Sequence, residues 1–210
     1  MHGPEADGLR TPRQRELIRV ATHLFAQRGY HAVGINEISG ELGLTGPAFY
    51  RHYPSKEALL IAVLDDAISG HLEEVRDLVS SIFDPRATLD AIIAHHVEFV
   101  FEQTENIMTW RTEFRMIPET DRHRLRYLQR LYTEEWVRTL RQLRPELDVD
   151  EVRAMCHAAI ALLQSPTEFH NKLTRAQVTP VLISMATQAL MGPSASAAPS
   201  AVPAPTRAAR

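Results

Sequence analysis

Helical spacing of apolar residues runs through nearly the whole chain, and no stretch alternates convincingly with the period of two that a half-buried strand requires. Proline and glycine divide this pattern into segments, for example at Gly29, Gly43, Pro54, Pro118 and Pro145. With 210 residues, of which 44% are hydrophobic, the chain is long enough for one ordinary domain and a smaller one. These features predict an all-α protein of about nine helices.

The first 56 residues are predicted to form a compact unit of three helices. Thr11 caps the first helix and Gly29 ends it. The third helix begins at Thr45, whose hydroxyl is expected to cap it, and only a short turn around Gly43 separates it from the second. This is the layout of a helix-turn-helix, in which the second helix of the pair lies in the DNA major groove.

The start of the third helix is suited to contact with DNA. Gly46 and Pro47 allow the backbone to approach base edges, and the Pro47 ring can contact a thymine methyl group. Farther along, hydroxyl, guanidinium and imidazole groups can reach phosphates from Tyr50, Arg51 and His52. Lys56 falls in the first turn of the fourth helix, where free N–H groups and the helix dipole favour an anion.

Residues 11–60 resemble the DNA-binding domain of the TetR family of transcriptional regulators. The resemblance is carried by Ala21, Phe25 and Gly29-Tyr30, by the segment INEISGELGLT, and above all by FYRHYPSKEALL. It implies a three-helix DNA-binding domain followed by a larger helical domain for ligand binding and dimerisation. The implied function is that of a ligand-released repressor, which binds double-stranded DNA at a palindromic operator as a homodimer.

The resemblance also implies which residues contact the operator. The base-facing positions are Asn36, Thr45, Gly46, Pro47 and Ala48, and the phosphate-facing ones are Tyr50, His52 and Lys56. Arg51 is added for its charge and position. Because Gly46-Pro47-Ala48 offers few polar side chains to bases, direct readout is expected to depend on Asn36, Thr45 and DNA shape. Gly34 also departs from the family pattern, in which a capping threonine is frequent here.

Charge and composition divide the chain further. Residues 9–56 carry seven Arg or Lys against three acidic residues, whereas residues 57–110 carry two against eleven. We therefore expect a disordered arm over residues 1–10, the DNA-binding domain over 11–56, the effector and dimerisation domain over 57–191, and a disordered tail rich in Ala, Pro and Ser over 192–210. The fourth helix, from Lys56 to about Ile82, would connect the two domains.

The last two helices each carry an apolar side. The predicted dimer contacts on these helices are Met155, Ala159, Leu163, Val181, Leu182 and Met185. The small residues Ala154, Ala158 and Ala161 would allow another helix to approach closely. Burial of the same apolar sides within one monomer is the alternative.

The predicted effector pocket rests on apolar, aromatic and arginine side chains in the middle of the chain. Its candidate residues are Phe99, Met108, Trp110, Arg111, Phe114 and Tyr127. An ordinary core is the alternative for the aromatic residues and Met108, and a solvated face for the arginines around them. Because residues 111–144 carry nine arginines against five acidic residues, the unknown small-molecule effector is expected to be anionic. The resemblance to regulators of lipid metabolism suggests an acyl-CoA-like ligand.

Other classes of protein are less compatible with the sequence. His95, Glu98 and Glu102 lie near one helical face and suggest a metal-dependent enzyme or metal sensor, but no second His/Glu pair at ligand spacing is evident on another helix. A helical scaffold without DNA binding is a third possibility. The chain lacks a glycine-rich phosphate loop or paired-cysteine motif, so we expect no enzyme activity, cofactor or bound metal.

The compartment is inferred from cysteine and apolar content. Cys156 is the only cysteine, so an intrachain disulfide is impossible, and its Ala-rich surroundings indicate a packed apolar side chain. No apolar run approaches 18 residues, and the start of the chain lacks a signal-peptide pattern. We expect a soluble cytoplasmic protein without membrane association.

Overall fold

The computed structural model describes residues 10–168 and 173–193, and this part of the chain confirms the all-helical fold. Its α-helices are α1 (Pro12–Arg28), α2 (Ile35–Gly40), α3 (Gly46–Phe49), α4 (Lys56–Ser81), α5 (Pro85–Glu102), α6 (Thr104–Glu113), α7 (Glu119–Leu143), α8 (Val149–Gln164) and α9 (Arg175–Met191). Two short 3-10 helices follow α6 and α8, at Phe114–Met116 and Ser165–Thr167. Most of the predicted disordered arm and tail lies outside the described residues.

Side-chain caps explain where several helices begin. The hydroxyls of Thr11 and Ser55 and the carboxylate of Asp84 each accept a hydrogen bond from the backbone N–H three residues ahead, at 3.2, 3.0 and 2.8 Å. Thr174 forms a capping box at the start of α9, which therefore begins before Pro180 and contains that proline. The last helix thus starts at Arg175.

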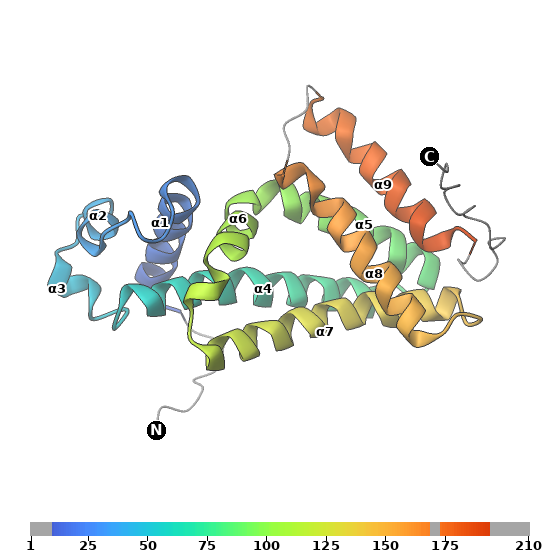
Figure 1. The fold of residues 1–210 in the computed structure, drawn as a ribbon, viewed down its shortest axis with the longest axis horizontal. Helices are drawn as coiled ribbons and strands as arrows, with labels where there is room; N and C mark the ends of the chain where they lie inside the picture. Colours follow the sequence, from blue (N-terminus) through green and yellow to red (C-terminus); the bar gives the residue numbers. More distant parts are fainter. Residues whose placement is uncertain (1–9, 169–172, 194–210) are drawn as a thin grey trace, which may run out of the picture.

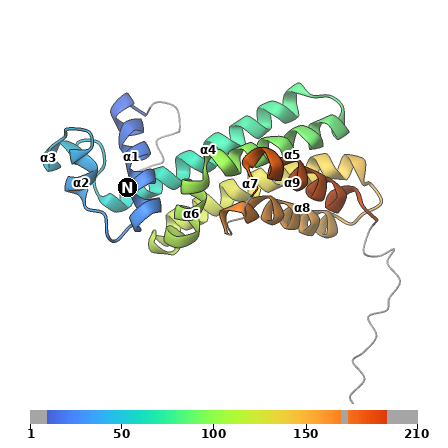
Figure 2. The ribbon, with the colours of Figure 1, turned by 90° about the horizontal axis from the view of Figure 1, so that it is seen from above.

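The molecule is elongated along α4 (Figure 1). Helices α1, α2 and α3 form a head at one end, and α4 leads from this head into a larger helical body. Helix α7 runs alongside α4, while α8 and α9 pack against each other and against α5 at the far side of the body (Figure 2). The 26 residues of α4 span roughly 39 Å, so a single helix connects the head with the body.

Two clusters of buried apolar side chains hold this arrangement together, and both use α4. The head cluster is built around Phe25 and Phe49, and it extends past Lys56 into α4 as far as Leu64. It also includes Ile117 and Leu125 from the larger half of the chain, both almost fully buried. The body cluster surrounds the buried ring of Trp136. Ile68 and Leu128 pack against both clusters.

Candidate DNA-binding surface and effector cavity

A tight turn places α2 and α3 beside each other. Gly43 in this turn has a φ of +64°, a backbone conformation that side-chain-bearing residues rarely adopt. The backbone N–H of Leu44 donates to the carbonyl of Ser39 at 2.8 Å and closes the turn. The head therefore has the predicted helix-turn-helix arrangement.

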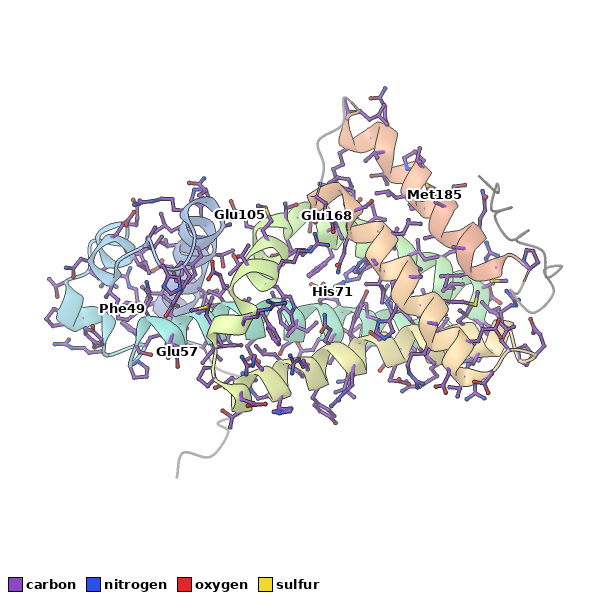
Figure 3. The ribbon with its side chains drawn as sticks, in the orientation of Figure 1. Phe49, Glu57, His71, Glu105, Glu168 and Met185 are labelled. Carbon is purple, nitrogen blue, oxygen red and sulfur yellow. The ribbon has the colours of Figure 1, made fainter. Side chains whose placement is uncertain are left out.

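Helix α3 is short and is held to the head by its last residue. The Phe49 side chain is fully buried, and its ring lies against Tyr50 and Tyr53 with centroid distances of 5.5 and 6.3 Å. Phe49 is labelled in the head in Figure 3. With Phe49 pointing inward, Thr45, Pro47, Tyr50 and Arg51 are exposed, as is Asn36 on α2, while Gly46, Ala48 and His52 are half-buried.

Thr45 and Asn36 differ in how their surroundings hold them. Thr45 occupies the N-cap position of α3, but its hydroxyl makes no capping hydrogen bond, contrary to the expectation from the sequence. Asn36 lies against Gly46, because a Cβ atom added to Gly46 would be 3.0 Å from the Asn36 Oδ1 atom. The glycine thus leaves room for the side chain predicted to contact a base.

Lys56 has an intramolecular role that the sequence did not indicate. Its Nζ atom donates to the backbone carbonyls of Tyr30 and Val33, at 2.8 Å each, and lies 4.2 Å from the centroid of the Tyr30 ring. Partial burial lowers the pKa of the Lys56 ammonium group, and the nearby Glu113 carboxylate acts in the opposite direction. The side chain fastens the start of α4 to the α1–α2 loop. One of its three N–H donors remains for the predicted phosphate contact.

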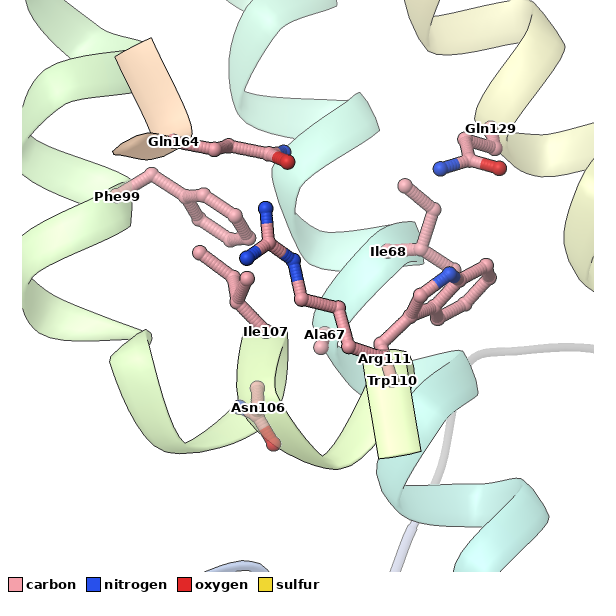
Figure 4. A pocket seen from close by; sticks show the side chains of 9 residues that line it. All are labelled: Ala67, Ile68, Phe99, Asn106, Ile107, Trp110, Arg111, Gln129 and Gln164. Carbon is pink, nitrogen blue, oxygen red and sulfur yellow. The ribbon is translucent and has the colours of Figure 1, made fainter. Parts of the chain in front are cut away.

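A cavity opens in the body between α4, α5, α6, α7 and α8 (Figure 4). It measures about 80 Å³, and its lining is Ala67, Ile68, Phe99, Asn106, Ile107, Trp110, Arg111, Gln129 and Gln164. In Figure 4 the Arg111 guanidinium lies near the side chains of Phe99, Ile107 and Gln164. The same guanidinium forms an ion pair with Glu168 at 2.7 Å.

A second, larger cavity of about 220 Å³ adjoins the first, since Ile68, Phe99, Gln129 and Gln164 line both. Its other residues are His71, His96, Arg130, Tyr132, Thr133, His157 and Ile160. The two cavities together combine apolar and aromatic side chains with a larger number of polar and charged ones, so they offer a ligand both apolar contact and hydrogen bonds.

Two buried imidazoles and a phenol lie in contact with one another in the wall of the second cavity. The Nε2 atom of His71, labelled in Figure 3, lies 3.2 Å from Nδ1 of His96, and the Tyr132 hydroxyl lies 2.7 Å from the same Nδ1. Burial, reinforced by the neighbouring imidazoles, lowers the pKa of His71 to about 2. Burial likewise lowers the pKa of His96 to about 3 and raises that of Tyr132. All three groups are therefore uncharged near neutral pH.

The predicted effector residues are not all brought together. Phe99, Trp110 and Arg111 line the first cavity. Met108 and Tyr127 are exposed, and the Tyr127 ring centroid lies 5.8 Å from the guanidinium carbon of Arg130. Phe114 stacks on Trp110 at 4.6 Å and packs against the head cluster. Helical spacing alone did not separate these outward positions from the cavity wall.

The predicted dimer residues also divide into two groups. Ala159, Leu163 and Leu182 are at most 5% exposed, because their sides of α8 and α9 pack into the body cluster, so they are core residues of one protomer. Met155 is half-buried against the same cluster. Val181 and Met185 are 47% and 50% exposed on the opposite side of α9. The small residues Ala154, Ala158 and Ala161 are exposed on α8.

The metal-ligand set suggested by the sequence is wrong. Glu98 and Glu102 form ion pairs with Arg175 on α9. The carboxylate beside His95 belongs to Glu74 on α4, at 3.3 Å. His71 and Glu74 are spaced three residues apart, so α4 does supply the second His/Glu pair that the sequence analysis had not found.

A helix-turn-helix head joined by one long helix to an all-helical body with an internal cavity defines a class of DNA-binding transcriptional regulator. The family model described as "Bacterial regulatory proteins, tetR family" matches residues 17–63, which cover most of the head and the start of α4. The head, together with the start of α4, is therefore a DNA-binding domain of the TetR family. Among the described residues, no helix combines the length and apolar character needed to cross a membrane.

Similar proteins include both a transcriptional repressor and a transcriptional activator. The chain is 29% identical over 136 residues to the transcriptional repressor KstR2 of Rhodococcus jostii, covering 64% of this chain and 66% of that protein. It is 30% identical over 112 residues to the transcriptional activator FasR of Mycolicibacterium smegmatis, covering 53% of this chain and 48% of that one. The structure of AibR in complex with isovaleryl coenzyme A and operator DNA matches with a TM-score of 0.72 at 19% identity, covering 82% of this chain and 97% of that chain.

Proposed function

We propose that this protein is a cytoplasmic repressor that binds an inverted-repeat operator as a homodimer and is released by a small anionic ligand with an apolar part. Its role is regulatory and not catalytic. The proposal is carried by the exposed side chains of α2 and α3. Asn36 lies against Gly46, and the buried Phe49 side chain anchors the recognition helix.

The exposure and chemistry of these side chains indicate which contact bases and which contact phosphates. Asn36 is available for base edges, and so is the hydroxyl of Thr45, because it makes no capping hydrogen bond. Tyr50 and Arg51 are exposed beyond them, where they supply phosphate contacts that position the helix without selecting a sequence.

The dimer proposal rests on the outer side of α8 and α9. Val181 and Met185 expose apolar surface there, and the exposed alanines of α8 present no large side chain that would keep a second copy away. Because two helices from each copy would then pack together, a two-fold axis would relate the recognition helices. An inverted repeat is the DNA sequence that matches such symmetry.

The ligand proposal rests on the two adjoining cavities. Arg111 and Arg130 offer positive charge at their walls, and Asn106, Gln129 and Gln164 offer hydrogen bonds to a carboxylate, a thioester or an amide. An acid that binds Arg111 has to compete with its ion pair to Glu168. Acyl-CoA compounds and their parent acids combine an anionic part with an apolar chain and are the class we propose. The AibR complex with isovaleryl coenzyme A is a precedent within the same fold.

Release from DNA requires a connection between cavity and head, and α6 supplies one in addition to α4. Glu113, at the end of α6, accepts a hydrogen bond from the backbone N–H of Tyr30 at 3.2 Å. Tyr30 in turn accepts from Lys56 at the start of α4. A ligand that displaces α6 through Trp110 or Arg111 would therefore shift the loop that orients α2 and α3.

Selection of bound sequences from a random duplex library, followed by sedimentation of the complex, tests the proposed function. We expect an inverted repeat with half-sites separated by whole turns of DNA and two protein chains per site. Addition of short- and medium-chain acids and their coenzyme A thioesters should then release the operator. An asymmetric site occupied by one chain would contradict the dimer, and retention of DNA with every acid and thioester would contradict the ligand class.

A further inference from the structure

Three side chains from two helices converge at the junction of α4 and α5, where His71 also lines the second cavity. The Nε2 atom of His95 lies 3.1 Å from Nδ1 of His71 and 3.3 Å from Oε2 of Glu74. All three ligand atoms lie within 4.8 Å of one another. Two ligands bound tetrahedrally to zinc, each at about 2.0–2.1 Å, are about 3.3 Å apart. The two separations measured from His95 Nε2 match that spacing.

A second layer of contacts holds His71 in the orientation that metal binding needs. Its Nε2 atom faces Nδ1 of His96 at 3.2 Å, and the imidazole ring is packed between Phe99 and Tyr132, at centroid distances of 3.6 and 4.4 Å. Metal binding at Nδ1 requires the proton of His71 to be on Nε2, which faces Nδ1 of His96. This leaves the lone pair of His71 Nδ1 directed at His95 and Glu74. Ligating histidines in metalloproteins are oriented in the same way by a partner on their other ring nitrogen.

We propose that His71, Glu74 and His95 bind one divalent transition-metal ion of the zinc class and thereby clamp α4 to α5. Two imidazole nitrogens and one carboxylate oxygen are the donors of sites that leave further positions to water or another ligand. Magnesium and calcium prefer oxygen ligands throughout, so they fit this set poorly.

The surroundings allow an ion to enter and favour positive charge. Glu74 and His95 keep 64% and 22% of their side-chain surface exposed, so the site opens to solvent while His71 forms its floor. They line a surface groove together with the acidic residues Asp77, Glu98 and Glu102. Arg175 offsets the charge of Glu98 and Glu102, so Glu74 and Asp77 supply the negative charge that attracts a cation to this groove.

Calorimetric titration of zinc into the untagged, chelator-treated full-length protein tests the site directly. We expect binding of one zinc ion per chain, a rise in the melting temperature with zinc, and a visible ligand-field spectrum of low coordination number with cobalt. Glu74→Gln and His95→Gln are the informative variants because both side chains are partly exposed, whereas His71 is packed among aromatic rings. Each should weaken zinc binding by about tenfold or more and remove the cobalt spectrum.

Two further variants serve as matched controls. His123 and Glu119 form a surface pair at 3.5 Å on α7, so His123→Gln removes an exposed imidazole beside a carboxylate without affecting the proposed ligands. Glu98→Gln alters the same acidic groove while sparing the three ligands. Both should keep the cobalt spectrum and the zinc stoichiometry. The proposal is overturned if the wild type binds zinc no better than the His95→Gln variant, or if Glu98→Gln removes binding while Glu74→Gln retains it. Melting curves in chelator confirm that each variant is folded.

Discussion

The ammonium group of Lys56 donates to the carbonyl of Tyr30 at 2.8 Å and also lies over the ring of the same residue. The start of the long connecting helix is therefore fixed to the loop that precedes the helix-turn-helix. A residue predicted to contact a DNA phosphate thus also maintains the geometry of the head.

Lys56→Ala should consequently affect folding as well as DNA binding. Loss of its two charge-assisted hydrogen bonds leaves two carbonyls without their donor, and we expect the free energy of unfolding to fall by about 1–3 kcal/mol. Affinity for every duplex should fall by a similar factor, and the slope of log affinity against log salt should decrease by about one. Urea unfolding and salt-dependent binding measure the two effects. Arg51→Ala is the comparison, because it should reduce the salt slope and leave stability unchanged.

Gly46→Ala should weaken operator binding without unfolding the head. The new Cβ atom would lie 3.0 Å from Oδ1 of Asn36 and force that side chain to move. If Asn36 reads a base directly, the loss is about 1–3 kcal/mol of binding free energy, confined to the preferred operator. Gly40→Ala is the control, since a Cβ atom there meets nothing within 4 Å. Equal operator affinities for the two variants, measured by fluorescence anisotropy, would refute this role of Asn36.

Met185→Glu should convert the proposed dimer into a monomer. The side chain is 50% exposed on α9, and burial of a carboxylate in an apolar interface costs several kcal/mol. Sedimentation at micromolar concentration should give the mass of one chain, and protection of the inverted repeat should be lost. Phe83→Glu changes a 98% exposed aromatic residue in the turn between α4 and α5 and should leave the dimer intact. A dimeric Met185→Glu protein would place the interface elsewhere.

Glu113→Ala should weaken the coupling between ligand and DNA. Its carboxylate joins α6 to the Tyr30 backbone, and without it α6 acts on the head only through side-chain packing and the His23–Glu105 ion pair. The coupling free energy, about 1–3 kcal/mol in regulated proteins, should fall and is obtained by titrating ligand with and without operator. Glu113→Gln retains an oxygen that accepts from Tyr30 and should retain most of the coupling. Unchanged coupling in Glu113→Ala would show that this hydrogen bond does not transmit the ligand signal.

Cys156 should be unreactive in the folded protein. Burial raises the pKa of its thiol to about 12, so the nucleophilic thiolate is scarce at pH 8, and the side chain is inaccessible to reagents. A chromogenic disulfide reagent should react with less than one thiol per chain in buffer over minutes and with one in guanidinium. Fast reaction under native conditions would show that α8 opens readily.

Local signals made much of the fold predictable. Caps at Thr11, Ser55 and Asp84, and the turn at Gly43, act within a few residues, so they can be recognised without knowing the tertiary structure. The break between α5 and α6 at Gln103 has no proline or glycine at its position, and its exact place was not predicted.

Contacts between distant residues were the part that sequence reasoning could not supply. The acceptors of Lys56 are backbone carbonyls, which every sequence offers, so no residue type marked them. His71 and His95 are 24 residues apart on separate helices, and their meeting depends on how α4 and α5 cross. Apolar residues such as Ala159 and Val181 looked alike in the pattern, although one is buried in the protomer and the other is exposed.

The head cluster includes Leu59 to Leu64 of α4 together with Ile117 and Leu125 from beyond α6. A fragment that stopped at residue 56 would leave much of that cluster open to water. The recognition helix is therefore not a portable module. A transplanted recognition helix would need the first turns of its own α4 and the apolar side chains of Ile117 and Leu125 to complete its core. Chimaeras in this fold should therefore be joined within the body, downstream of Leu125.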